Sequence, residues 1–193
     1  MRIVVPASTA NLGSGFDAIG MALSLTVELG LVDGEIPERA EVASGAHPAA
    51  TAFAGAGGRG RVWVRGSIPS GRGLGFSGAV RVGAIGLALQ QNDGGDVLLT
   101  RRDEIFRRAA ELEGHGDNVA ASTYGGVVVA ADAVVARVPI AVDPAVVVWI
   151  PSSRTNTAES RAELVPMVSR EDAVFNLART GLLVAALATG DVT

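Results

Sequence analysis

The chain has 193 residues, 48% of them hydrophobic, no cysteine and a formal net charge of −4. This length and composition indicate a globular protein with a real core, and they exclude a disordered or fibrous chain. The lack of cysteine excludes disulfides, thiolate metal sites and a thiol nucleophile. The negative charge argues against a nucleic-acid partner, because such binding needs a basic surface.

All 16 basic residues are arginine. The phosphate-binding lysines of Walker A loops and of protein kinases are therefore excluded, and any phosphate site must use backbone N–H groups, arginine and metal. The longest apolar run, residues 182–188, is shorter than the roughly 20 residues of a membrane helix. Residues 1–6 also lack the features of a signal peptide. We expect a soluble, cytoplasmic protein with no membrane partner.

The first half of the chain is predicted to alternate strands and helices. Leu25, Val27, Leu29 and Leu31 follow the period of two that is typical of a strand with one buried face. The expected elements are a strand at 3–5, a polar turn at 7–15, a strand at 23–32, a helix at 48–56 and a strand at 61–65.

A helix predicted over residues 74–91 contains three glycines, Gly78, Gly83 and Gly86. Each costs about 1 kcal/mol relative to alanine in a helix. So many glycines indicate a helix that lies close against another element, most simply a sheet.

The second half is predicted to begin with a helix at 100–113, opened by a capping box at Thr100–Asp103. The remaining elements are strands at 125–131, 133–138 and 145–150, a linker at 151–156 and a helix from Ser169 to Thr189. Because neighbouring strands are predicted to pair as hairpins, an α+β fold fits better than a doubly wound parallel sheet.

A glycine-rich loop follows the strand at 61–65. Gly71, Gly73 and Gly75 alternate in Pro-Ser-Gly-Arg-Gly-Leu-Gly-Phe-Ser-Gly-Ala, residues 69–79. Glycine permits positive φ and lets backbone N–H groups approach phosphate oxygens, and the following helix adds its unpaired N–H donors. Ser77 can add a hydroxyl to phosphate or to magnesium. Composition alone leaves an anion site and an ordinary turn about equally open.

Three other polar groups also suggest a site. Asn11 and Asp17 flank a glycine turn, where the alternative is an ordinary Asx turn, and a carboxylate there suits an ammonium group. Residues 111–119, Glu-Leu-Glu-Gly-His-Gly-Asp-Asn-Val, suggest a metal cluster, but a hydrogen-bonded structural role for His115 is favoured. Thr157 can cap a helix whose Arg161 clamps a carboxylate, although a surface arginine is the default.

Residues 69–79 resemble the P-x-x-x-G-L-x-S-S-A motif of the GHMP kinases. Residues 5–17, 111–119 and 156–161 resemble further motifs of the homoserine kinases within that family, in the same order. Phe76 replaces the first serine of the pair, and Gly78 and Arg81 stand where the family has small alanine or serine residues. The matches extend from Val5 to about Asp191.

The resemblance implies a GHMP kinase fold. Residues 1–150 would form the ATP-binding N-terminal domain, which is like domain 2 of ribosomal protein S5. Residues 151–193 would begin a ferredoxin-like C-terminal domain. We expect a truncated chain, because the third glycine-rich motif and a second substrate arginine are not found in it. A natural short form is the alternative.

The implied reaction is ATP-dependent phosphorylation of the hydroxyl group of L-homoserine, with Mg²⁺ as cofactor. No general base stands out, and phosphoryl transfer depends mainly on positioning and charge neutralisation. The alternatives are a non-catalytic nucleotide or amino-acid binding fragment and a GHMP kinase for another small hydroxyl substrate. The sequence leaves a homodimer open.

The resemblance also assigns site residues. The phosphates would be bound by Pro69, Gly71, Arg72, Gly73, Leu74, Gly75 and Ser77, and magnesium by Ser77 and Glu111, which is preferred to Glu113. Homoserine would be bound by Asn11, Asp17, Asn118, Thr157 and Arg161. Adenine is expected to dock near residues 34–58, the region that matches the family least.

Overall fold

The computed structural model describes residues 1–150 and 162–191. In chain order the elements are β1 (Arg2–Asn11), β2 (Gly15–Leu31), β3 (Glu41–Val42), α1 (Pro48–Gly55), β4 (Val62–Gly66), α2 (Phe76–Asp93), α3 (Val97–Thr100), α4 (Arg102–Glu113), α5 (Asp117–Tyr124), β5 (Val127–Ala131), β6 (Val134–Val138) and α7 (Arg170–Thr189).

The strands form one antiparallel sheet around β2. The order is β3-β4-β2-β5-β6, and β1 also pairs with β2. The 17-residue β2 has room for three neighbours, with β4 at residues 27–31 and β5 at residues 19–21. Antiparallel pairing and mixed helices confirm the α+β class.

The N-terminal strands are longer than predicted. Residues 7–11, expected in a turn, continue β1, and Ser8, Thr9 and Ala10 pair with residues 20–22 of β2. Only residues 12–14 form the turn. The register shifts at Pro6/Ser8 and Ala10/Asn11 let the strand bend there.

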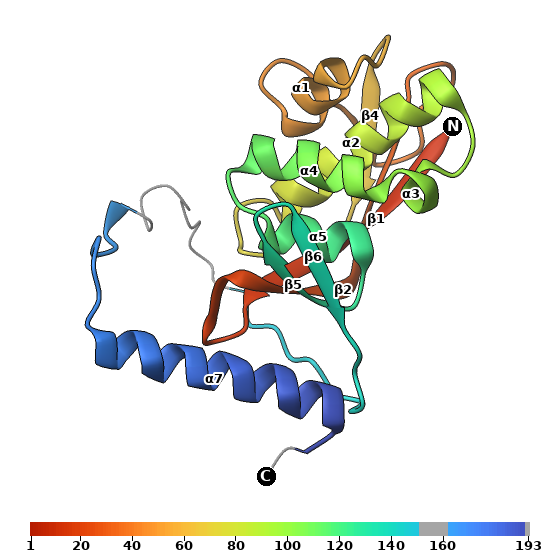
Figure 1. The fold of residues 1–193 in the computed structure, drawn as a ribbon. Coiled ribbons are helices and arrows are strands. Elements are labelled where there is room, and N and C mark those ends of the chain that lie inside the picture. Colours follow the sequence, from red (N-terminus) through yellow and green to blue (C-terminus); the bar gives the residue numbers. More distant parts are fainter. Residues whose placement is uncertain (151–161, 192–193) are drawn as a thin grey trace.

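Helices α2 and α5 pack on one face of the sheet, and α4 packs on both of these helices (Figure 1). The prediction that glycines bring α2 close to a sheet is confirmed. A Cβ at Gly83 would lie 2.4 Å from Leu29 Cδ1, and one at Gly86 would lie 3.0 Å from Ile3 Cδ1. The core between these layers includes fully buried Ile85 and Phe106.

Several predicted boundaries differ from the structure. Helix α2 begins at Phe76 rather than Leu74, and the capping box at Thr100 does not form, since Asp96 caps the short α3 instead. Elements β3, α3 and α5 were not predicted. The strand expected at 145–150 is absent from the described chain, and Trp149 is 83% exposed there. A strand needs a neighbour for its backbone hydrogen bonds, and none of the described strands pairs with this segment.

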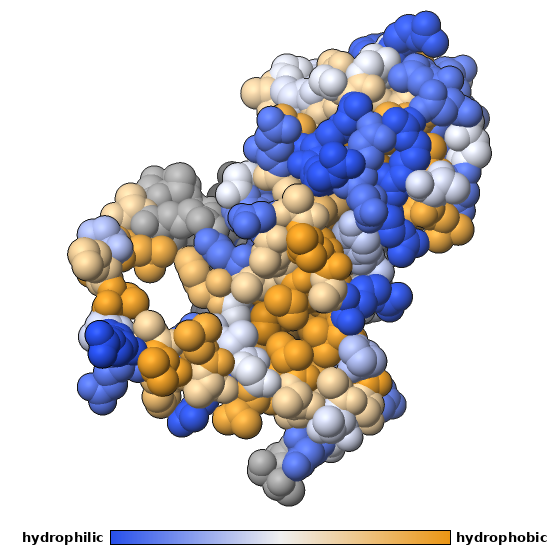
Figure 2. All heavy atoms as spheres, viewed as in Figure 1, coloured by the Kyte–Doolittle hydropathy of each residue, from blue (hydrophilic) through white to orange (hydrophobic). Residues whose placement is uncertain are grey.

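Helix α7 is confirmed, with the Ser169 side chain accepting a hydrogen bond from Asp172 N at 3.0 Å. It lies along the edge of the molecule, and none of its described residues is buried (Figure 1). Leu183, Val184 and Leu187 pack against a small cluster around Ile19. Apolar residues gather over this part of the surface, as Figure 2 shows. By length and composition alone α7 is apolar enough to cross a membrane, a weak criterion that core helices of soluble proteins also meet.

Candidate active site

The glycine-rich loop between β4 and α2 lines a cleft of about 500 Å³. We call this the loop cleft; its walls are Glu41, His47, Pro48, residues 70–77, Glu113, His115 and Asn118. Gly71, Gly73 and Gly75 all have positive φ, as the sequence suggests. Gly75 immediately precedes α2, so the first unpaired N–H groups of the helix and its positive dipole end adjoin the cleft.

Gly75 is required for a second reason. A Cβ at this position would lie 2.1 Å from Ser8 Oγ and 3.1 Å from Asn118 Oδ1. Ser8 is fully buried and ties the loop to the rest of the fold. Its Oγ donates to Asn118 Oδ1 at 2.9 Å, and its backbone N–H donates to Leu74 O at 3.3 Å. Ser8 was not predicted as a site residue from the sequence.

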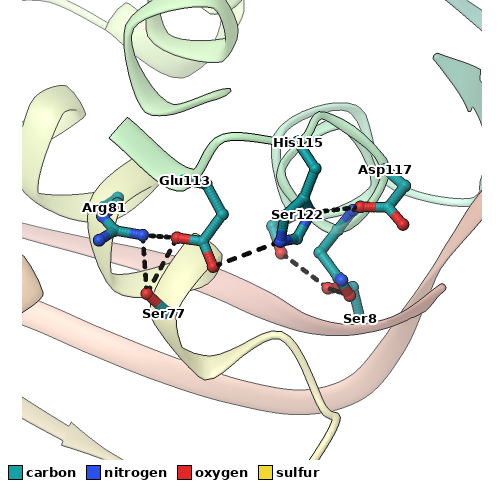
Figure 3. A network of polar contacts seen from close by, with 8 residues as sticks. Ser8, Ser77, Arg81, Glu113, His115, Asp117 and Ser122 are labelled. Atoms are coloured by element: carbon teal, nitrogen blue, oxygen red, sulfur yellow. Dashed lines mark hydrogen bonds and ion pairs between the residues drawn. The ribbon is translucent and has the colours of Figure 1, made fainter. Parts of the chain in front are cut away.

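Ser77, Arg81 and Glu113 form a compact network beside the loop (Figure 3). Ser77 Oγ donates to Glu113 Oε2 at 2.9 Å, and Arg81 Nη1 donates to Ser77 Oγ at 2.8 Å. The Arg81 guanidinium also forms an ion pair with Glu113. Burial lowers the pKa of Arg81 from its usual value. Through this ion pair Arg81 places a positive charge beside the loop, at a position where the family motif has a small residue.

The structure places Glu113, and not Glu111, next to Ser77. Residues two apart on a helix point to different sides, so the two glutamates of α4 serve different clefts. Glu111 is exposed and lines a separate cleft. The glutamate of α4 that lies beside the loop is therefore Glu113 and not the predicted Glu111.

His115 and Asp117 form a second polar group. His115 Nδ1 lies 2.8 Å from Asp117 Oδ1, which also accepts the backbone N–H of Asn118 at 2.7 Å. Asp117 is only 2% exposed, so its two hydrogen bonds compensate for its burial. The hydrogen bond predicted for His115 is present. His115 Nε2 also lies 4.0 Å from Glu113 Oε1, which brings the two polar groups together.

A neighbouring cleft of about 480 Å³ shares His115 with the loop cleft. We call it the acidic cleft, since its walls include Asp17, Glu111 and Asp132 together with Arg107. Of the predicted pair, Asp17 lines this cleft, whereas Asn11 is not among its lining residues; the Asn11 Oδ1 instead accepts the Asp17 backbone N–H at 2.9 Å. Two clefts that meet at one histidine can hold two ligands side by side.

Only some of the other predicted site residues line one of the two clefts. Asn118 lines the loop cleft rather than the acidic cleft, and Pro69 is not among the residues that line either one. Arg72 and Leu74 belong to the loop cleft as predicted. Thr157 and Arg161 lie outside the described residues.

The far rim of the loop cleft comes from the region where adenine was expected. His47 caps α1 by accepting the Ala49 N–H at 3.1 Å through Nδ1. Its ring meets the ring of Phe76 edge-on, with centroids 6.1 Å apart. Burial lowers the pKa of His47, and Glu41 partly opposes this shift. An apolar ring and an imidazole can together contact a flat base.

No group of three or more His, Cys, Asp or Glu residues that could hold a metal occurs in the described part of the chain. Ser77 and Glu113 nevertheless supply two hard oxygen atoms 2.9 Å apart beside the loop. Magnesium typically takes one or two protein ligands and fills its remaining positions with phosphate and water. The donor set therefore fits a magnesium ion that is shared with a phosphorylated ligand.

Comparisons with known proteins agree with this geometry. Residues 42–126 match the family model of the GHMP kinases N terminal domain. The homoserine kinase of Moorella thermoacetica is 39% identical over 207 residues, covering 97% of this chain and 69% of the relative. That of Mycobacterium tuberculosis is 39% identical over 213 residues, covering 95% and 66%. The chain thus spans about two thirds of the length of these relatives.

Solved structures show the same fold. A Listeria monocytogenes protein assigned as a homoserine kinase has a TM-score of 0.74 at 27% identity, covering 98% of this chain and 70% of that one. The homoserine kinase of Cytophaga hutchinsonii has a TM-score of 0.73 at 23% identity, covering 99% and 68%. The fold is that of the GHMP kinases, and the chain belongs to the homoserine kinase family within them.

Proposed function

We propose that the chain carries the ATP site and most of the acceptor site of a kinase that converts L-homoserine to O-phospho-L-homoserine. The observation that carries this proposal is the meeting of the loop cleft and the acidic cleft at His115. A phosphate donor in the first cleft and a small acceptor in the second would lie next to each other. Such positioning is the main requirement of phosphoryl transfer.

In the loop cleft, ATP phosphates would be held by the backbone from Gly71 to Ser77. The left-handed glycines and the start of α2 supply N–H donors, so the absence of lysine from the sequence is no obstacle. Adenine would extend towards His47, Pro48 and Phe76 at the rim. Within the region 34–58, where adenine was expected to dock, we thus propose His47 and Pro48 as the contacting residues.

Ser77 and Glu113 would hold Mg²⁺ together with the phosphate oxygens. When bound, the ion supplies positive charge that neutralises the phosphates during transfer. Ser77 Oγ and Glu113 Oε2 already lie 2.9 Å apart, so one ion could contact both oxygens.

In the acidic cleft, the charges suit a zwitterion. Asp17, fixed by Asn11, would pair with the ammonium group, and Arg107 provides a cation on the same wall. Asn118, which lines the adjoining loop cleft, and Thr157 and Arg161 remain proposed homoserine ligands. His115, between the two clefts, would lie closest to the hydroxyl group that receives the phosphate.

We further propose that residues 1–150 form the ATP-binding domain and residues 151–193 begin the second domain. The acidic net charge and the small ligand clefts support a cytoplasmic metabolic enzyme without nucleic-acid or membrane partners. Light scattering would show whether the protein forms a homodimer.

Homoserine-dependent release of ADP from ATP tests the function. We expect turnover with L-homoserine and little with mevalonate or galactose, which lack the ammonium that Asp17 would bind. Turnover with another hydroxyl compound while homoserine is inert would contradict the proposed substrate. ATP binding without turnover on any substrate in the panel would instead support a nucleotide-binding fragment.

A further inference from the structure

Arg81 is the charged residue among the three departures from the family motif in the phosphate region. It stands four residues after Ser77 on α2, where small residues are usual, so both side chains lie on one face of the helix. Its Nη1 contacts Ser77 Oγ and also pairs with Glu113 (Figure 3). This single nitrogen contacts both of the oxygens to which magnesium is assigned.

The guanidinium and a metal ion cannot share this position. The side chains of Arg81 and Glu113 are only 20% and 12% exposed, so water screens their charges weakly. A divalent cation bound to Ser77 Oγ and Glu113 Oε2 would meet the positive charge of Arg81 at contact distance. Metal binding therefore requires Arg81 to turn away, and its charge then needs another anionic partner.

We propose that Arg81 is a resident counter-ion that keeps divalent metal out of the Ser77–Glu113 pair until the metal arrives with nucleotide phosphates. The phosphates give the displaced guanidinium a new partner, since arginine binds phosphate oxygens well. The metal alone offers it none. Arg81 thus makes metal binding depend on nucleotide, and it acts as a positioning residue for the proposed kinase site, on which this inference rests.

Binding of Mn²⁺ alone, followed by electron paramagnetic resonance of the free ion, tests the proposal. In the nucleotide-free chain, we expect Arg81→Gln to bind Mn²⁺ about 10- to 100-fold more tightly than the unchanged protein, because a positive charge is removed from a poorly screened site. Arg81→Lys, which keeps the charge, is the matched control and should show little gain. Adding Glu113→Gln to Arg81→Gln should abolish the gain.

The outcomes separate this inference from the function on which it rests. If the unchanged protein binds Mn²⁺ together with ATP but Arg81→Gln shows no gain in binding Mn²⁺ alone, Arg81 is not the excluding group. If Glu113→Gln leaves Mn²⁺–ATP binding intact, the assignment of Ser77 and Glu113 to the metal fails instead, and this inference fails with it.

A measurement on the unchanged protein covers the case in which Arg81→Gln does not fold. The Nε–H resonance of Arg81, assigned with Arg81→Lys, should stay in place when Mg²⁺ is added alone. It should shift when ADP is added at the same Mg²⁺ concentration. A shift with Mg²⁺ alone would overturn the proposal.

Discussion

Helices α2 and α7 are similar in length and differ completely in their surroundings. Eleven of the 18 residues of α2 are buried, whereas none of the 20 described residues of α7 is. Helix α2 uses glycine, alanine and valine to lie flat on the sheet, while α7 presents Phe175, Leu177 and Leu182 to solvent. An apolar composition therefore does not by itself decide whether a helix is buried.

The two helices are held in place by different kinds of interaction. The position of α2 is set by contacts with β1, β2, α1 and α4, and this precision passes to the loop that precedes it. Helix α7 depends on its own hydrogen bonds, the Ser169 cap and a few contacts near Ile19 and Ser14. Helices held mainly by local interactions are marginally stable in water.

The largest expected effect is the contrast between two phenylalanines. Phe106 of α4 is fully buried, and Phe175 of α7 is 58% exposed. Phe106→Ala should lower the free energy of unfolding by about 3–5 kcal/mol, because it empties a packed core. Phe175→Ala should change it by less than about 0.5 kcal/mol. Urea unfolding measures both, and equal losses would mean that α7 is as well packed as the core.

A second pair compares two glycines of the loop. Gly73 and Gly75 both have positive φ, but of the two only Gly75 has other atoms within 4 Å of the point where a Cβ would stand. Gly73→Ala should cost about 1–2 kcal/mol of backbone strain. Gly75→Ala should cost about 1–3 kcal/mol more, because the methyl group collides with Ser8. The same urea titration decides; if the two variants lose the same stability, the contact with Ser8 does not constrain the loop.

The third pair tests which glutamate of α4 binds the magnesium ion at the phosphates. Glu113→Gln should lower kcat/KM for ATP-dependent phosphorylation about 100-fold, equivalent to about 2.7 kcal/mol. Glu111→Gln should change it only a few-fold, because Glu111 lines the acidic cleft away from Ser77. Steady-state ADP release under saturating magnesium measures both. A larger loss for Glu111→Gln would restore the assignment made from the sequence.

The smallest effect concerns the rim of the loop cleft. The pKa of His47 lies below its ordinary value of 6.5, mainly because burial disfavours its charged form. Its contribution to stability is therefore complete above about pH 6.5 and is lost as the pH falls through the lower folded pKa. His47→Asn keeps a capping side chain without this titration. Urea unfolding between pH 7 and 5, values spanning the ordinary pKa of histidine, should show a shallower decline for this variant; identical slopes would contradict the assignment.

The sequence predicted the elements whose signals are local. Strand β2, the β5–β6 hairpin, α2 and α7 all follow from periodicity and caps. Helix α5 was missed because its eight residues include Asn, Ser, Thr and Val, which are weak helix formers. It forms because Gly20 lets it lie directly on β2, where a Cβ would meet the Asp117 carbonyl oxygen at 2.2 Å. That contact is invisible in the sequence.

The position of Glu113 beside Ser77, by contrast, could have been predicted from the sequence. The buried positions of α4 are Ile105, Phe106 and Ala109, and Glu113 continues this stripe at a spacing of four. Helical phase thus pointed Glu113 inward and Glu111 outward. The strand predicted at 145–150 could not have been corrected in this way. An apolar run predicts a buried strand from its composition alone and does not show whether another strand pairs with it.

The close packing of α2 also has a mechanical consequence. With Gly83 and Gly86 pressed against Leu29 and Ile3, the helix has no room to slide or roll on the sheet. The start of α2 is thus a fixed reference point, to which the flanking loop is attached. Among the described walls of the loop cleft, the start of α2 is therefore the part least able to move when ligands bind.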